Sequence, residues 1–470
     1  MLTIRPALAA LALVLAACTG TGAHKDAPPP PAPPAPAPTL NISVEYYRLA
    51  NGLRVVLSHD DTVPTTTIAV YYHIGFRTEP KGRTGFAHLF EHLMFEETTN
   101  LDRGEAARLV TGNGGISNGS TRFDFTNYFQ VVPSHVTRPV LWAEADRMRG
   151  LALTEKSFQN QKDVVKSEVR VNVLNRPYGG FGWLDLPQFA FQNWRNAHNF
   201  YGDFADLDAA TLADVKAFYD TYYVPSNAVL VVAGDFDRAT VKAWIDEYFG
   251  PLATKPAPAR PDISEPPQTK EIRASHTDPL APRPGLAVGY HLPERNSREW
   301  YAFGLLDQIL LQGEDSRLWR RLVAEKGYSD RVEGGMNLVG NMFDYEGPMI
   351  WSFNLIHDAS TSDQQIMADV DAVIADIQTH PVGAAELDRA ITKMRSELYD
   401  LAGSPTRFGL VDLLACFALF DDNPARIDSL ELEFRRVTPE ELTATARQYL
   451  RPENRTVMTL VAGAAGPAAK

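Results

Sequence analysis

Apolar residues recur along the 470-residue chain with two spacings, one typical of buried strands and one typical of helices. Runs of β-branched, aromatic and small apolar residues predict strands at residues 66–72 and 285–290. Helical patterns at residues 212–222 and 439–449 each end in the same turn, Tyr-x-x-Pro-x-Asn, and a mostly apolar strand follows each turn. We therefore predict that one helix–turn–strand unit occurs twice.

Proline-rich sequence at residues 251–283 is predicted to be a linker between two regions of comparable length, 42–250 and 284–465. Each region begins with strand-like sequence, continues with helical patterns and closes on the repeated unit. Chance similarity of two such units is the alternative, but the matching order and lengths favour duplication. The predicted fold class is α+β, with two homologous domains that each pack helices on a mixed or antiparallel β-sheet.

Residues 1–18 have the features of a bacterial lipoprotein signal peptide. Arg5 supplies a positive charge, and the apolar run at residues 8–17 is too short to span a bilayer. The run ends in Leu-Ala-Ala-Cys, which resembles the lipobox whose cysteine is acylated. We expect lipid attachment at Cys18 and an exported, periplasm-facing protein, with an ordinary secretion signal as the alternative. Thr19, in place of an aspartate, favours the outer membrane.

Residues 19–41 are predicted to form a tether. Eight of the eleven residues at 28–38 are proline, a composition that favours an extended polyproline II segment. Such a segment would hold the body of the protein away from the membrane, and a ligand for an SH3-type domain is the alternative. If Cys18 is acylated, Cys416 remains alone, and its apolar helical surroundings predict a buried thiol.

The composition of the chain argues against several classes of protein. The 45 basic and 58 acidic residues give a formal net charge of −13, which argues against nucleic acid as a partner and against a polybasic membrane-binding surface. Two cysteines cannot build a disulfide framework unless they pair with each other. The chain is long enough to bury real hydrophobic cores, so its folding needs no disulfide or metal.

The strongest chemical signal is the sequence His-Leu-Phe-Glu-His at residues 88–92. On a helix, His88 and His92 project from one face about one turn apart, a spacing that suits two ligands of one zinc ion. Glu91 lies near the same face and can accept a proton from a zinc-bound water, which is peptidase chemistry. Two core histidines beside an unrelated glutamate are the alternative, but the HxxEH order is a catalytic signature.

Two histidines and a water leave one protein ligand unassigned. Spacing alone does not choose among the candidate carboxylates Glu96, Glu97, Asp124, Glu144, Asp146, Glu155 and Glu168. The HxxEH motif, followed by a helical glutamate at position 168, resembles the pitrilysin/insulinase family of inverted-motif zinc peptidases. In that family the third ligand lies in a helix similar to residues 164–170, so the resemblance implies Glu168 as a ligand and one Zn²⁺ per chain.

A glycine-rich segment carries a second part of the resemblance. Residues 114–121, followed by Asp124, Thr126 and Tyr128, resemble the family's strand beside the zinc ion. An extended substrate adds to the exposed edge of that strand through main-chain hydrogen bonds. The resemblance therefore implies substrate-binding roles for Asn118, Gly119, Ser120 and Thr121.

The resemblance covers most of residues 43–463 and implies a fold in which the two domains form half of a clam-shell chamber. It also implies a zinc metalloendopeptidase that hydrolyses extended peptides or unfolded polypeptide segments, with Glu91 as the base. The chain resembles the zinc-bearing subunit type of two-subunit members, such as the beta subunit of mitochondrial processing peptidase and bacterial two-subunit relatives. The alternative is a non-catalytic structural or assembly subunit, which a broken HxxEH motif would indicate; here the motif is intact.

The sequence departs from the family at two places. Many members carry an arginine and a tyrosine, seven residues apart, that hold the substrate across the cleft, but the matching positions here are Val323 and Asp330. A register shifted by two residues offers Arg321 and Tyr328 instead. We therefore expect a homologous partner subunit that supplies the pair, with a homodimer as the alternative. Gln161 stands where several relatives place a supporting glutamate, which puts the tuning of the metal site in doubt.

Overall fold

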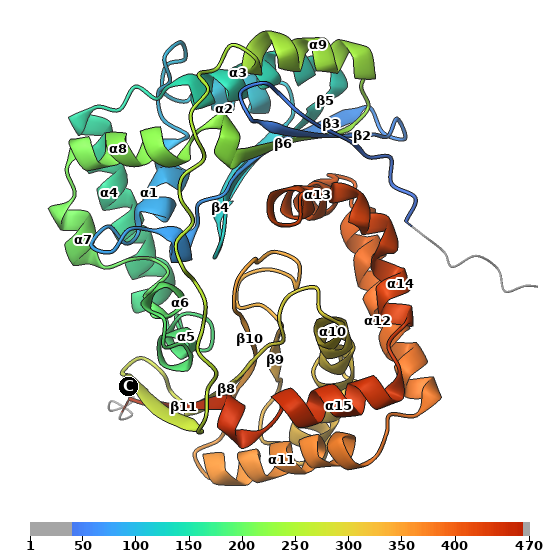
Figure 1. Ribbon diagram of the computed structural model, residues 1–470. Helices are drawn as coiled ribbons and strands as arrows, with labels where there is room; N and C mark the ends of the chain where they lie inside the picture. The colour runs from blue at the N-terminus through green and yellow to red at the C-terminus, as the bar shows by residue number, and fades with distance from the viewer. Residues whose placement is uncertain (1–39, 464–470) are drawn as a thin grey trace, which may run out of the picture. The chain divides into compact units, whose positions relative to one another are not determined.

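The computed structural model describes residues 40–463. The predictions of a signal peptide, of lipid attachment at Cys18 and of most of the tether lie outside the described residues. Two β-sheets organise the described chain, and helices cover each of them (Figure 1). Within residues 40–463, no helix is both long enough and apolar enough to cross a membrane.

The first sheet has six strands in the order β1-β2-β6-β3-β5-β4. Its strands are β1 (Glu45–Arg48), β2 (Arg54–His59), β3 (Thr65–Tyr72), β4 (Ile116–Thr121), β5 (Thr126–Pro133) and β6 (Ala228–Gly234). The helices between residues 73 and 250 are α1 (Phe86–Leu93), α2 (Glu105–Thr111), α3 (Thr137–Arg149), α4 (Glu155–Val169), α5 (Asp185–Ala190), α6 (Trp194–Ala197), α7 (Phe204–Ala209), α8 (Leu212–Tyr222) and α9 (Arg238–Phe249). We call this part of the chain, residues 45–249, the first half.

The second sheet has five strands in the order β7-β11-β8-β10-β9. Its strands are β7 (Ile272–Asp278), β8 (Gly285–His291), β9 (Glu333–Gly335), β10 (Ile350–Ile356) and β11 (Arg455–Ala462). Its helices are α10 (Arg298–Leu310), α11 (Asp363–Thr379), α12 (Ala384–Ala402), α13 (Phe408–Phe420), α14 (Leu430–Arg435) and α15 (Pro439–Tyr449). This part, residues 272–462, is the second half.

The two sheets share one pairing pattern. In the first sheet β6 lies parallel to β2 and antiparallel to β3, and β5 and β4 continue the antiparallel order. In the second sheet β11 lies parallel to β7 and antiparallel to β8, and β10 and β9 continue it. Only β1 has no counterpart in the second sheet as the structure describes it. The prediction of two homologous α+β domains is confirmed by this shared topology.

The repeated Tyr-x-x-Pro-x-Asn turn has the same hydrogen bonds in both halves. Asn227 Nδ2 donates to the carbonyl oxygen of Tyr222, at the end of α8, at 2.9 Å, and to that of His73 at 3.4 Å. Asn454 Nδ2 donates to the carbonyl oxygens of Tyr449, at the end of α15, and of His291, both at 2.9 Å. Each asparagine therefore joins a helix end to the end of a neighbouring strand, which explains why this residue recurs in the motif.

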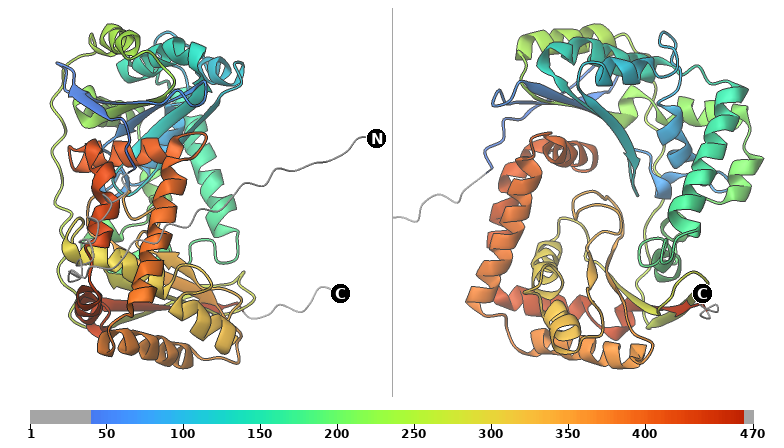
Figure 2. Two further views of the ribbon diagram at one scale, coloured as in Figure 1. Left: turned by 90° about the vertical axis from the view of Figure 1, so that its right-hand side faces the viewer. Right: turned by 180° about the vertical axis from the view of Figure 1, so that it is seen from behind.

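Each half also contributes a helix that packs against the sheet of the other half. Helix α13 of the second half packs against β2, β3 and β6 of the first sheet, as both views in Figure 2 show, and α5 of the first half packs against β7, β8 and β11. Cys416 lies on α13 with no exposed surface, and burial raises the pKa of its thiol. The sequence-based prediction of a buried thiol therefore agrees with the structure, and the helix around it is apolar because it fills the space under a sheet.

The predicted linker is longer than the segment without regular structure. Strand β7 falls inside residues 251–283 and pairs with β11, so the irregular segment runs from residue 251 to about residue 271. Exposed positions alternate along β7, and it carries Arg273 and His276, so it lacks the apolar run that identified the other strands. Glu265 fixes the irregular segment to the first half, because its carboxylate accepts hydrogen bonds from Gln192 N at 2.5 Å and Asn196 Nδ2 at 2.9 Å.

Candidate metal centre and active site

Helix α1 carries the HxxEH motif on a mostly buried segment. Its apolar residues Phe86, Leu89, Phe90 and Leu93 are almost completely buried against the rest of the first half. This packing fixes the rotation of the helix about its axis, so that His88 and His92 project toward α4. The two imidazole rings are 5.0 Å apart between centroids and nearly perpendicular.

Glu168, near the end of α4, faces both histidines. His92 Nε2 lies 3.1 Å from Glu168 Oε2, and His88 Nε2 lies 3.7 Å from Glu168 Oε1. Hydrogen bonding to His88 and His92 holds the pKa of Glu168 well below its usual range. The carboxylate is thus ionised at neutral pH, as a metal ligand must be.

The donor set fits a zinc ion. Ligand atoms of His88, His92 and Glu168 all lie within 4.8 Å of one another, as they would around one shared ion. Two imidazole nitrogens and one carboxylate oxygen, with a fourth position left for water, match the composition of catalytic zinc sites. His92 and Glu168 are partly exposed, with 21% and 34% of their side-chain surface accessible, so solvent and substrate can reach the group.

The other carboxylates that spacing left open do not join the histidine pair, and all of them except Glu97 have other partners in the described chain. Asp124, in the hairpin between β4 and β5, lies 3.4 Å from Arg77 Nε, and neither side chain has any exposed surface. Its other oxygen accepts a hydrogen bond from Glu346 N at 2.7 Å. The remaining partners are Arg103 and Gln161 for Glu96, Arg147 for Glu144, Thr98 for Asp146 and Gln159 for Glu155.

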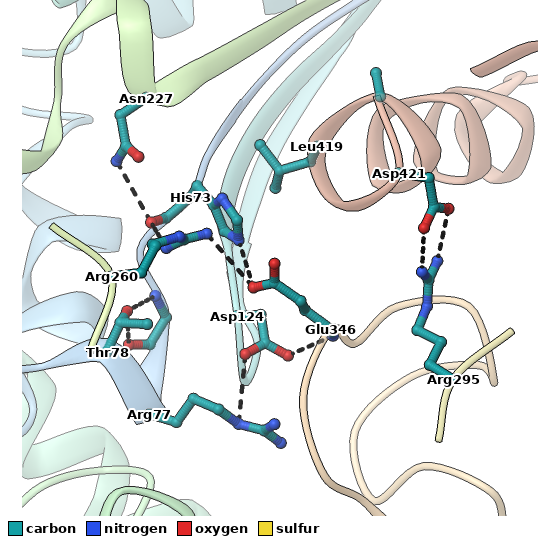
Figure 3. Close-up of polar contacts among 12 residues, drawn as sticks. His73, Arg77, Thr78, Asp124, Asn227, Arg260, Arg295, Glu346, Leu419 and Asp421 are labelled. Carbon is teal, nitrogen blue, oxygen red and sulfur yellow. Dashed lines mark hydrogen bonds and ion pairs between the residues drawn. The ribbon is translucent and has the colours of Figure 1, made fainter. Parts of the chain in front are cut away.

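Figure 3 shows Asp124 in a polar network that joins the halves. Glu346 belongs to the second half, yet its carboxylate lies 2.9 Å from His73 Nε2 and 3.5 Å from Arg260 NH2. Arg260 also donates a hydrogen bond to the carbonyl oxygen of His73 at 3.0 Å. Asp124 therefore stabilises the junction between the halves, and its position excludes a role as the third ligand of the histidine pair.

Glu91 is held by the end of β4. Thr121 Oγ1 donates a hydrogen bond to Glu91 Oε2 at 2.7 Å. Thr121 was predicted to bind substrate, but its hydroxyl proton is used in this contact. The hydrogen bond fixes the carboxylate of Glu91 beside the two histidines and brings the end of β4 next to the same place.

The other predicted substrate-binding residues lie on β4, which is an edge strand. Its one strand partner in the described sheet is β5, so the main-chain groups on its other edge are not used in the sheet. Ser120 Oγ donates to Asn127 Oδ1 at 2.6 Å, and Asn118 Oδ1 accepts from Gly119 N. The side chains of Asn118 and Ser120 thus bond within the protein, and the backbone edge of β4 is the part that an extended peptide could pair with.

Tyr201 contacts His88, and nothing in the sequence predicts this contact. Its ring lies 5.1 Å from the His88 ring between centroids and also contacts Trp183. Burial, together with the negative charges of Glu168 and Glu91, raises the pKa of the Tyr201 hydroxyl, which stays protonated at neutral pH. No spacing rule links residue 201 to residue 88, because a loop between α6 and α7 brings them together.

Arg321 and Tyr328 share a carboxylate partner on α11. Arg321 Nε donates to Asp369 Oδ1 at 2.8 Å, and Tyr328 OH donates to Asp369 Oδ2 at 2.7 Å. In the unshifted register, Val323 packs against the core and Asp330 lies 3.8 Å from Arg283. The shifted pair is therefore the one whose side chains lie close together in space.

Gln161 contacts a carboxylate instead of providing one. Its Nε2 donates to Glu96 Oε1 at 2.6 Å, and Arg103 Nε lies 3.0 Å from Glu96 Oε2. Glu96 lies just after the end of α1, in the turn that follows Leu93. Gln161 and Arg103 therefore hold the Glu96 carboxylate between them.

A second group of possible metal ligands in the described chain has a different character. Asp344, Asp412 and Cys416 are buried between α13 and the first sheet. Burial raises the pKa of both carboxyl groups, and Tyr71 OH donates to Asp412 Oδ1 at 2.7 Å. Burial thus disfavours the charged forms of these groups, which pack with α13, in contrast to the ionised Glu168.

Comparison with known proteins agrees with this architecture. Residues 54–177, which include the HxxEH motif and Glu168, match the family described as insulinase (peptidase family M16). Residues 209–394 match the domain described as the peptidase M16 inactive domain. The chain belongs to peptidase family M16, whose members include zinc proteases, and the predicted resemblance is confirmed.

Individual relatives are similar over most of the chain. The zinc protease PqqE of Helicobacter pylori is 26% identical over 425 residues, which cover 88% of this chain and 92% of that protein. The crystal structure of a protease from Helicobacter pylori superposes with a TM-score of 0.81 at 25% identity, covering 89% of this chain and 99% of that one. The periplasmic protease PqqL of Escherichia coli shares the fold at 19% identity and a TM-score of 0.73, and 91% of this chain matches 48% of PqqL.

Proposed function

We propose that this protein is a zinc metalloendopeptidase that hydrolyses extended peptides or unfolded polypeptide segments. The observation that carries the proposal is the convergence of His88, His92 and Glu168 beside Glu91. His88 Nε2, His92 Nε2 and the Glu168 carboxylate would hold the ion. Family membership supports zinc protease chemistry in general, and the complete HxxEH motif supports it for this chain.

Each residue has a defined task in this mechanism. A zinc ion bound here supplies Lewis-acid chemistry, because it lowers the pKa of a bound water and polarises a peptide carbonyl. Thr121 donates a hydrogen bond to Glu91 Oε2, so Oε1 is the oxygen that accepts the proton of the attacking water. Glu91 then delivers this proton to the leaving amine, which completes peptide-bond hydrolysis without a covalent enzyme intermediate.

The substrate is proposed to bind as an added strand along β4. Main-chain hydrogen bonds give affinity with little dependence on sequence, which suits a peptidase that accepts many extended segments. Because Thr121 ends β4 and contacts Glu91, a peptide paired with this strand would run directly toward the histidine pair. The substrate must be extended, since a folded helix presents no free strand edge for pairing.

Metal binding and peptide cleavage test the proposal together. Purified protein should contain about one zinc per chain by elemental analysis and cleave an unfolded protein such as reduced casein. Glu168→Gln should weaken zinc binding in a chelator competition by more than about tenfold, because a neutral amide replaces an ionised ligand. Glu155→Gln, on the same helix, is the control and should bind zinc as the wild type does. Protein that stays metal-free at saturating zinc would overturn the assignment.

A homologous partner subunit is part of the proposal. Its support is the absence of an arginine–tyrosine pair in the unshifted register and the match of this chain to about half of PqqL. In a homodimer, Arg321 and Tyr328 would instead serve the zinc site of the second copy. Mixing Glu91→Gln protein with Arg321→Ala protein separates the cases, since restored hydrolysis would show a homodimer and overturn the need for a different subunit.

We also propose that the protein is a lipoprotein that faces the periplasm, attached through Cys18 to the outer membrane. The support is the sequence of residues 1–18 and the proline-rich segment that follows. Wild-type protein should incorporate radiolabelled palmitate in growing bacteria and sediment with outer-membrane vesicles. Cys18→Ala protein should do neither, whereas labelling of this variant would overturn the assignment.

A further inference from the structure

Within residues 40–463, His88 is not oriented by a hydrogen bond from its second ring nitrogen. A metal-ligating histidine is usually oriented by a hydrogen bond from its second ring nitrogen to a carboxylate or carbonyl group. His88 Nδ1 is buried, and no residue of the described chain accepts a hydrogen bond from it. The position of His88 must therefore depend on how α1 itself is held.

The N-terminus of α1 is held by a carboxylate from the segment just before the helix. Glu79, which has no exposed surface, accepts hydrogen bonds from Gly85 N at 2.9 Å and from Ala87 N at 2.6 Å. Gly85 is the N-cap residue and has no side chain that could satisfy these amide groups. A negative charge at this end of a helix is also favoured by the helix dipole. Glu79 thus replaces the missing cap, and Ala87 is the residue next to His88.

Two further segments pack around Glu79 and the N-terminus of α1. His198 Nε2 lies 3.6 Å from Glu79 Oε2, and the Trp194 ring stacks on the His198 ring at 4.5 Å. The backbone of Gly202 packs so closely on Gly85 that a Cβ atom at residue 202 would come within 2.2 Å of Gly85 N. This loop carries Tyr201 to the His88 ring. The N-terminus of α1 is therefore enclosed by fixed groups on several sides.

We propose that Glu79 is a positioning residue of the metal centre, which sets His88 for zinc binding by capping α1. The inference rests on the proposed zinc site and assigns no contact between Glu79 and the ion. The hydrogen bond to Ala87 N fixes the backbone one residue before His88, and α1 is only eight residues long. A shift at its first turn is therefore transmitted directly to His88 and His92.

The experiment measures zinc affinity of the full chain rather than activity alone. Glu79→Ala should lower zinc affinity by about 10- to 100-fold in a chelator competition, as loss of supporting contacts does at other metal sites. Glu79→Gln keeps one oxygen acceptor but opposes the other amide group with its own NH2, so it should lose about 3- to 10-fold. At saturating zinc, kcat should fall in both variants while KM changes little, because β4 is untouched.

Asp278 provides a matched control. Its buried carboxylate also accepts two backbone hydrogen bonds, from Tyr178 N at 2.7 Å and from Leu280 N at 2.8 Å, but at the end of β7. Asp278→Ala should lower the melting temperature and leave zinc affinity unchanged. Equal loss of zinc affinity in Asp278→Ala and Glu79→Ala would reduce the effect to general destabilisation and overturn the proposal.

Three further outcomes separate the role of Glu79 from the proposed zinc site and peptidase function. Wild-type zinc affinity in Glu79→Gln overturns the proposal, and this variant gives the result if Glu79→Ala does not fold. If wild-type protein binds zinc but cleaves no peptide, the proposed peptidase function fails while the role of Glu79 remains testable by affinity. If wild-type protein binds no zinc, the proposed metal centre and the role of Glu79 fail together.

Discussion

The helix pairs next to the two sheets show what duplication kept and what it changed. In the first half, α1 faces α4, and His88, His92 and Glu168 meet between them. In the second half, α10 faces α12, and Gln308 Nε2 donates to Glu397 Oε2 at 3.1 Å. Both pairs bring polar side chains together, but only the first provides two imidazoles and an ionised carboxylate.

Burial accounts for much of this difference. Glu168 is about one-third exposed and paired with histidines, so it stays charged. Asp307 on α10 is buried beside Trp351 and Gln312, and burial raises its pKa to about 7. The repeated scaffold therefore does not by itself define a reactive site. A reactive site also requires side chains whose charge state is set by solvent access and by neighbouring groups.

Replacement of Glu91, the proposed base in the first half, should reduce peptide hydrolysis more than any other substitution. Glu91→Gln should lower kcat by about 10²- to 10⁴-fold, because the amide cannot accept the proton of the attacking water. Its zinc content should stay that of the wild type, since Glu91 is not a ligand. Glu397→Gln, at the matching helix pair, should keep wild-type hydrolysis. A fully active Glu91→Gln protein would contradict the assignment of the base.

Asp124→Asn tests whether a carboxylate near the motif has a structural or a metal-binding role. The substitution leaves the Arg77 guanidinium buried without a counter-charge, so the free energy of unfolding should fall by about 3–5 kcal/mol. Urea denaturation measures this change, and zinc affinity should stay unchanged. A stable variant that had lost zinc affinity would reverse the roles of Asp124 and Glu168.

Asp307 makes the stability of the second half depend on pH. Since its pKa is raised from 3.8 to about 7, its contribution to stability is complete below about pH 4 and is lost as the pH rises through 7. A change of this size corresponds to at most about 4 kcal/mol. Asp307→Asn should therefore stabilise the protein at pH 8 more than at pH 5, as measured by urea denaturation. An equal change at both pH values would show that Asp307 titrates normally.

Two substitutions in the repeated turn compare the two halves, and they should have the mildest effect. Asn227→Ala and Asn454→Ala each remove an amide that bonds two carbonyl groups, so each should cost about 1–3 kcal/mol in the free energy of unfolding. Chemical denaturation of both variants gives the comparison. A large cost at one position and none at the other would show that the repeated turn has different roles in the two halves.

Local sequence patterns predicted the parts of the site that one helix contains. The four-residue spacing places His88 and His92 on one face whatever the rest of the fold does, and the surrounding apolar residues show which side is buried. Duplication was predictable for a similar reason, because the helix, turn and strand of each unit are adjacent in sequence. Strand β7 was missed, since its alternating polar residues give a weaker signal than a buried strand.

Contacts between distant segments were decided by the tertiary structure. Residue spacing did not distinguish Glu168 from Asp124, and packing separated them by placing one opposite two histidines and the other against Arg77. The cap that Glu79 gives to α1, the Tyr201 contact with His88 and the shared partner of Arg321 and Tyr328 also depend on loops and helices that meet only after folding.

Sequence patterns alone were enough to predict the HxxEH motif on one helix face and the twofold repeat, because helix and strand periodicity are properties of neighbouring residues. Folding was needed to show which carboxylate lies opposite the two histidines, what caps α1 and which strand edge of the first sheet is unpaired in the described chain. These depend on the packing of α1 against α4 and β4, and side-chain packing over such separations leaves no periodic signal in the chain.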